Sequence, residues 1–112
     1  ITHAVREKFH RMKTVSVPAT DLVIAPSSIE GMGVVTQAPR QIEEYIAVAV
    51  LNGDRTIYGR YLNHSDDPNA YVGIGPGCEL YIIMSRAVPK DTEVTVDYRL
   101  IVGGGFNDNV EL

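Results

Sequence analysis

Two short blocks of the sequence carry side chains that could hold a ligand and align a reaction. Residues 60–69 contain an Asn-His-Ser run followed by Pro-Asn, and residues 93–98 end in Asp-Tyr. An amide such as that of Asn63 both donates and accepts hydrogen bonds, which suits a zwitterionic amino-acid group. By itself, an Asn-His-Ser run also fits a polar turn whose His64 is satisfied by backbone contacts. Tyr98 alone equally fits a strand-end tyrosine with its ring in the core and its hydroxyl in water.

A third segment places glycines before these blocks. Residues 27–35 contain Gly31 and Gly33 on either side of Met32. Because glycine has no Cβ, the backbone at both positions can approach a ligand closely. The competing interpretation is a plain β-turn between two strands.

Taken in this order, the three motifs resemble the signature of SET-domain protein-lysine methyltransferases, in particular the compact viral or bacterial type without a zinc-binding flank. The match spans residues 27–98. The resemblance implies a mainly β, β-clip fold of several small sheets, with the two C-terminal motifs in a knot-like arrangement. It also implies methyl transfer from S-adenosyl-L-methionine to the ε-amine of a lysine in a protein, with a basic histone-like tail as the expected substrate.

The resemblance also assigns roles to individual residues. Tyr98 would be the catalytic residue that orients the methyl group and the amine lone pair, and His64 a structural contact rather than a general base. Pro68 and Asn69 would fix the exit of their loop, with Asn69 bridging backbone groups. The expected cofactor-binding residues are Glu30, Gly31, Met32, Gly33, Arg60, Asn63, His64, Tyr98 and Phe106.

A lysine channel is the least constrained part of the expected site. Family channels have aromatic walls, which attract a cationic amine through their π faces. The candidates for the channel are Tyr45, Tyr58, Tyr71 and Val96, with Tyr61 and Phe106 as further rings. Each ring taken alone is equally explained as ordinary core. Val96 stands where many relatives carry the Phe or Tyr that limits the number of methyl groups.

The composition limits which kinds of partner and ligand the chain is expected to bind. The 112 residues suit one domain, and a net charge of −4 argues against broad phosphate binding and favours a basic protein partner. The single cysteine, Cys78, excludes a disulfide framework or a four-cysteine zinc site within this chain, and we expect no metal. We expect no membrane span and an intracellular location: the nucleus or host chromatin for a eukaryotic or viral protein, the cytoplasm for a bacterial one. A homo-oligomer remains open.

The pattern of apolar residues predicts short strands after a helical start. Val5, Phe9 and Met12 predict a short amphipathic helix over residues 3–13, within an N-terminal extension of residues 1–18. The core domain would span residues 19–98, and residues 99–112 would close the site. Asn52-Gly53 predicts a hairpin turn, although residues 41–51 also fit a helical period. The expected strands are 22–25, 34–37, 45–51, 55–58, 71–74, 79–84 and 93–98.

Two other functions fit parts of this pattern. Between Gln37 and Arg60 the chain lacks the glycine and the insert that the family usually carries there. This shortened middle would suit a catalytically inactive SET module that binds a peptide or builds an oligomer. A β-clip domain for nucleic acid or carbohydrate is the third alternative, and it predicts no affinity for S-adenosylmethionine.

Overall fold

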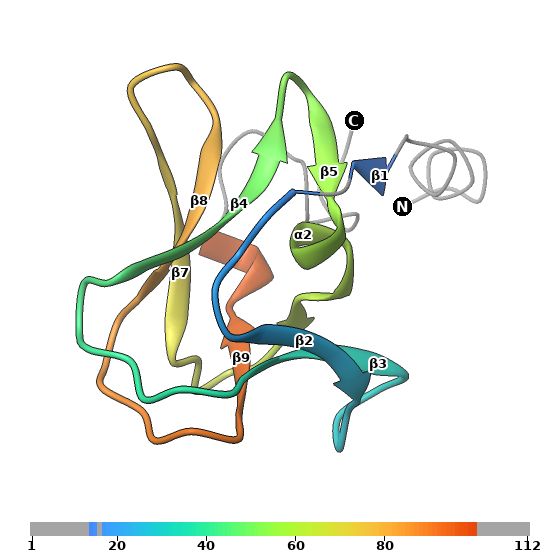
Figure 1. The fold of residues 1–112 in the computed structure, drawn as a ribbon, viewed down its shortest axis with the longest axis vertical. Helices are drawn as coiled ribbons and strands as arrows, with labels where there is room; N and C mark the ends of the chain where they lie inside the picture. Colours follow the sequence, from blue (N-terminus) through green and yellow to red (C-terminus); the bar gives the residue numbers. More distant parts are fainter. Residues whose placement is uncertain (1–13, 16, 101–112) are drawn as a thin grey trace.

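The computed structural model describes residues 14–15 and 17–100. In this part of the chain, short strands form two sheets whose strands alternate along the sequence, together with one brief α-helix (Figure 1). The expected N-terminal helix over residues 3–13, and Phe106, lie outside the described residues. The elements are β1 (Thr14–Val15), β2 (Leu22–Pro26), β3 (Met32–Thr36), β4 (Tyr45–Leu51), β5 (Asp54–Thr56), α2 (Ile57–Tyr61), β6 (Asn63–His64), β7 (Ala70–Ile74), β8 (Leu80–Met84), β9 (Thr92–Val96) and the 3₁₀ turn η1 (Tyr98–Leu100).

The larger sheet has the strand order β1-β5-β4-β8-β7. Its β4–β5 hairpin turns at Asn52 and Gly53, whose φ angles are 52° and 82°. These positive angles are the ones that a tight two-residue hairpin turn requires, so the predicted hairpin is confirmed and the helical alternative for residues 41–51 is wrong.

The return strand is shorter than predicted. It ends at Thr56 rather than at Tyr58, because α2 begins at Ile57. The Thr56 hydroxyl accepts a hydrogen bond from the Gly59 amide at 3.1 Å and donates one to the Val48 carbonyl at 2.6 Å. A buried threonine therefore caps the helix and ties it to β4, which a strand pattern read along the chain does not reveal.

The smaller sheet has the order β2-β3-β9-β6. Its antiparallel part pairs Val34 on β3 with Val94 on β9. On the other side of β9, the two-residue strand β6 runs parallel to it, with Asn63 opposite Thr95. This pairing places the two C-terminal sequence motifs side by side.

One hydrophobic core joins the two sheets and α2. Its members include Val34, Ile82, Met84 and Val94, none of which is exposed to solvent. The last three residues of β8 (Ile82–Met84) and of β9 (Val94–Val96) are all buried, and Ile82, Met84, Val94 and Val96 belong to this core. The opposite face of the β4–β8–β7 sheet is left to solvent and to its own side chains.

Candidate functional site

The loop after β6 is fastened along β9 by backbone and amide contacts. The Ser65 amide donates to the Val96 carbonyl at 2.9 Å. Asn69 accepts from the Thr95 amide and donates to the Glu93 carbonyl, both at 2.9 Å. The predicted backbone-bridging role of Asn69 is therefore confirmed, and its bonds hold residues 63–69 against the last motif.

The Asn63 side chain links the same region to the glycine segment. Its Nδ2 atom lies 2.9–3.2 Å from four acceptors: the Ser27 hydroxyl, the Glu30 and Met32 carbonyls, and Glu93 Oε2. An amide nitrogen carries two hydrogens, so these acceptors share them. All three sequence motifs thus meet at one amide group.

The structure gives a different reason for the glycine at each of the two positions in the first motif. Gly31 has a φ angle of +51° and open space where a Cβ would stand. At Gly33, a Cβ would lie 2.3 Å from Glu93 Oε2 and 3.2 Å from Asn63 Nδ2. Gly33 was expected to admit a ligand, but in the structure the close neighbours are the side chains of Glu93 and Asn63.

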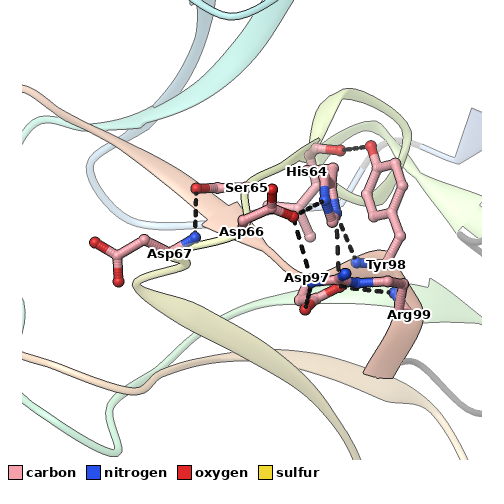
Figure 2. A network of polar contacts seen from close by, with 8 residues as sticks. His64, Ser65, Asp66, Asp67, Asp97, Tyr98 and Arg99 are labelled. Carbon is pink, nitrogen blue, oxygen red and sulfur yellow. Dashed lines mark hydrogen bonds and ion pairs between the residues drawn. The ribbon is translucent and has the colours of Figure 1, made fainter.

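His64 is held between Asp66 and the backbone of Tyr98 (Figure 2). The Tyr98 amide donates to His64 Nδ1 at 3.0 Å, while His64 Nε2 lies 3.0 Å from Asp66 Oδ1. Because Nδ1 uses its lone pair as an acceptor, the neutral ring carries its proton on Nε2 and donates it to Asp66. His64 therefore fixes the start of η1.

Tyr98 is anchored at both of its ends to the segment that contains the Asn-His pair. Its hydroxyl donates a hydrogen bond to the Leu62 carbonyl, and its ring centroid lies 5.3 Å from that of His64. The residue is half-buried. Asn63, His64 and Tyr98 consequently form one continuous region rather than lying on opposite sides of the molecule.

Asp97 and Arg99 form a fork beneath this region. Arg99 Nε lies 2.9 Å from Asp97 Oδ1, and Arg99 Nη2 lies 2.8 Å from Asp97 Oδ2. Hydrogen bonds from the Arg99 guanidinium, which outweigh the opposing effect of burial, lower the pKa of Asp97 from 3.8 to about 2. The carboxylate is therefore charged at neutral pH and holds the η1 turn in place.

The two consecutive aspartates of the loop have partners of their own. Asp67 lies 2.7 Å from Arg86 Nη2, and this pairing lowers the pKa of Asp67. Asp66 contacts Arg99 at 3.3 Å in addition to His64. Both carboxylates are exposed.

The expected channel residues do not share one hollow in the described part of the chain. Tyr58 and Val96 are buried in the core. Tyr71 lines a hollow of about 150 Å³ together with Asp97. Tyr45 lines a larger hollow of about 540 Å³, none of whose lining residues belongs to the three motifs.

Arg60 lies on α2, three residues before Asn63. Its guanidinium carbon is 5.7 Å from the centroid of the Tyr61 ring, within cation–π range. Its expected contact with a cofactor remains a prediction.

Three contributors to the site escaped prediction from the sequence: Ser27, Glu93 and Arg99. The Ser27 hydroxyl donates to the Glu93 carboxylate at 2.8–2.9 Å and accepts from the Ile29 amide at 2.8 Å. The one available signal was a charged residue, Glu93, in a strand otherwise rich in valine and threonine.

Among the described residues, no group of three or more His, Cys, Asp or Glu side chains is arranged to hold a metal ion. In the same residues, no helix has the length and apolar character needed to span a membrane.

Comparison with known proteins gives one family and one fold. The sequence model of the SET domain matches residues 6–99. A solved structure from Plasmodium falciparum, provisionally described as a histone methyltransferase, aligns with a TM-score of 0.62 and 23% identity. The alignment covers 77% of this chain and 98% of that one, so the two share a fold. A search of curated proteins found no match.

Proposed function

Because the chain belongs to the SET-domain family, we propose that it transfers a methyl group from S-adenosylmethionine to the ε-amine of a lysine in a protein. The observation that best supports this function is the convergence of the three motifs. Asn63 contacts the glycine segment and Glu93, while the neighbouring His64 holds the backbone of Tyr98.

The residues at this convergence suit the cofactor. The Glu30 and Met32 carbonyls each lie 3.2 Å from Asn63 Nδ2, and a carbonyl oxygen has a second lone pair that can also accept from an ammonium group. Space beside Gly31 is open for a ligand. When bound, S-adenosylmethionine supplies a methyl group on a positively charged sulfur.

Tyr98 is suited to hold the target amine. Its hydroxyl donates to the Leu62 carbonyl, and a phenol oxygen that donates can also accept a hydrogen bond, as from an N–H of the amine. The ring is fixed by His64 and by the backbone, which keeps the oxygen in a defined position. Alignment of this kind accounts for much of the rate of an in-line displacement.

The amine has to lose a proton before it can attack. A free lysine has a pKa near 10.4, and burial in an apolar site lowers that pKa. The hollow of about 150 Å³ is lined in part by Pro68, Ala70 and Val72, and the negative charge of Asp97 at its wall is balanced by Arg99, so the hollow would provide such surroundings. The ammonium proton would pass to water before the attack. The neutral amine would then take the methyl group as the bond between that methyl and the sulfonium sulfur breaks, leaving the sulfur as a neutral thioether.

The substrate is proposed to be a basic, histone-like protein tail. The net charge of −4 favours encounter with a positively charged partner. The structural relative from Plasmodium falciparum points in the same direction.

Calorimetry with S-adenosylmethionine, followed by transfer of a labelled methyl group to a lysine-rich peptide, tests the proposal. Tyr98→Phe should bind the cofactor almost normally but transfer the methyl group at least about tenfold more slowly. Tyr61→Phe is the matched control and should remain active.

Two outcomes would contradict the proposal in different ways. Unchanged transfer by Tyr98→Phe would remove Tyr98 from the mechanism. Cofactor binding without transfer to any peptide or protein tested would favour the inactive SET module instead.

A further inference from the structure

Three tyrosines gather on the face of the larger sheet that points away from the core. Tyr45 on β4 and Tyr71 on β7 are both paired with Ile83 on β8. Residues directly opposite one another in antiparallel strands project from the same face. Tyr81, two residues before Ile83, projects from that face as well, and its ring centroid lies 5.5 Å from that of Tyr45. We call this surface, formed by Tyr45, Tyr71 and Tyr81 around Ile83, the tyrosine face.

Aromatic rings form the solvent side of this face. Tyr45 is 61% exposed and Tyr71 is 37% exposed, whereas Ile83 beneath them is only 3% exposed. A Cβ at Gly73 would lie 2.8 Å from Ile83 Cδ1, so the glycine makes room for Ile83 on this face. The surface is therefore a layer of tyrosine rings packed over the buried side chain of Ile83.

Carboxylates border the rings. The Tyr71 hydroxyl donates to Glu43 Oε2 at 2.6 Å, and the Tyr81 hydroxyl donates to Glu79 Oε1 at 3.0 Å. These hydrogen bonds, aided by burial and by the negative charge, raise the pKa of both tyrosines. The hydroxyls therefore stay neutral, and each negative charge remains on its glutamate.

The hollow of about 540 Å³ continues the tyrosine face. It is lined by Tyr45 and Tyr81 and also by Asp21 and Glu44. Among its described lining residues, the basic one is Arg40, which is 7% exposed. The Arg40 guanidinium lies 3.0 Å from Glu44 and also donates to the Thr20 and Asp21 carbonyls. Its charge is thus directed into the protein.

We propose that the tyrosine face and this hollow dock lysine or arginine side chains of a basic protein segment. Exposed aromatic faces attract such cations, and the bordering carboxylates add complementary charge. A second copy of the chain would present the same acidic border, and like charges across an interface are unfavourable.

The position of Tyr71 suggests which basic segment docks. Tyr71 lines the hollow beside Asp97 as well as belonging to the tyrosine face. From β7 to β4 is two strand spacings, about 9–10 Å, which about three residues of an extended peptide cover. This identification rests on the proposed function: the docked cations would belong to residues that flank the target lysine, about three or more positions away from it.

Fluorescence anisotropy with a labelled ten-residue peptide of alternating lysine and alanine, in the absence of cofactor, tests the docking surface. Tyr45→Thr keeps a strand-compatible residue at an exposed position and should weaken binding about two- to fivefold. Tyr45→Phe keeps the ring and should bind like the wild type. Glu79→Gln should weaken binding at low salt, whereas Asp54→Asn, the same charge change in the β4–β5 hairpin, should not.

Several results would overturn this proposal. One is equal affinity of the wild type and Tyr45→Thr, and another is equally tight binding of a matching glutamate–alanine peptide. Self-association in sedimentation runs that Tyr45→Thr abolishes would make the face a contact between copies instead. Peptide binding is measured without cofactor, so it does not depend on methyl transfer. Absence of methyl transfer by the wild type, with intact Tyr45-dependent peptide binding, would therefore refute the proposed function alone.

Discussion

Replacing Gly33 by alanine should break the contacts that join the three motifs. The new methyl group would lie 2.3 Å from Glu93 Oε2, much closer than real Cβ atoms approach a neighbour. The Glu93 carboxylate is the end of a flexible side chain, so it can move away. In doing so, it would leave the Ser27 hydroxyl and the Asn63 amide.

The expected cost follows from those lost hydrogen bonds rather than from the clash itself. Two bonds to a half-buried carboxylate, at the low end of the range for charged groups, contribute about 3 kcal/mol. Alanine offsets up to about 1 kcal/mol of this by restricting the unfolded chain. Gly33→Ala should therefore lower the free energy of unfolding by about 2 kcal/mol.

A double-mutant cycle isolates this effect. In Glu93→Ala the carboxylate is absent, so adding Gly33→Ala should no longer destabilise the fold and should raise the free energy of unfolding by up to about 1 kcal/mol, through the same restriction of the unfolded chain. Urea unfolding followed by circular dichroism and tyrosine fluorescence is suitable, since the chain has no tryptophan. If Gly33→Ala cost the same in both backgrounds, Glu93 would not be the reason for the glycine.

Three further changes test the framework around the site. The pKa of Asp97 is lower in the folded state than in the unfolded chain, so its ion pair with Arg99 should stabilise the fold fully above pH 3.8. This contribution should be lost as the pH falls from 3.8 toward about 2. In thermal melts at about pH 2–5, the melting temperature of Arg99→Gln should therefore fall less across this window than that of the wild type. Thr56→Val should lower the free energy of unfolding in urea by about 1–2 kcal/mol, because the helix cap is lost. Thr56→Ser keeps the capping hydroxyl and should cost clearly less; an equal loss in both variants would mean that the cap is unimportant. Asn69→Asp has the same shape but cannot donate to the Glu93 carbonyl, so a loss of about 1–2 kcal/mol is expected, and unchanged stability would argue against the bridge.

The strands were predictable where local chemistry determines them. Asn52-Gly53 supplies the positive φ angles of its turn, and the apolar residues of β4 and β8 specify buried strands. Asp91 adopts a positive φ angle of 63°, which an aspartate tolerates in a turn. Helix α2 was missed because its five residues are too few for a helical period, and its cap bonds to a distant strand.

The sequence motifs identified residues of the candidate site, but they did not predict which of these residues contact one another. Asn63, His64 and Tyr98 were identified from motifs, yet the parallel pairing of β6 with β9 joins residues more than thirty positions apart. No local pattern encodes such a pairing. For the same reason Glu93, which meets Gly33 only across the sheet, escaped notice.

Which side chains share a surface outside the motifs depends on the pleat of the strands and on their pairing register, and the motifs do not specify either. Tyr45 and Tyr71 were expected in a lysine channel because they are aromatic, but composition does not say which face of a sheet a residue occupies. Their common pairing with Ile83 places them on the tyrosine face. One residue of register shift would have turned either of them to the other side.

The most direct test of the central claim is a backbone NMR titration with S-adenosylhomocysteine, which binds like the cofactor but cannot donate a methyl group. If the three motifs form one binding site, the amide signals of Gly31, His64 and Tyr98 should shift together with a single affinity, while that of Gly53 in the β4–β5 hairpin stays in place. Shifts confined to one motif, or no saturable shift at any of the three, would contradict the account.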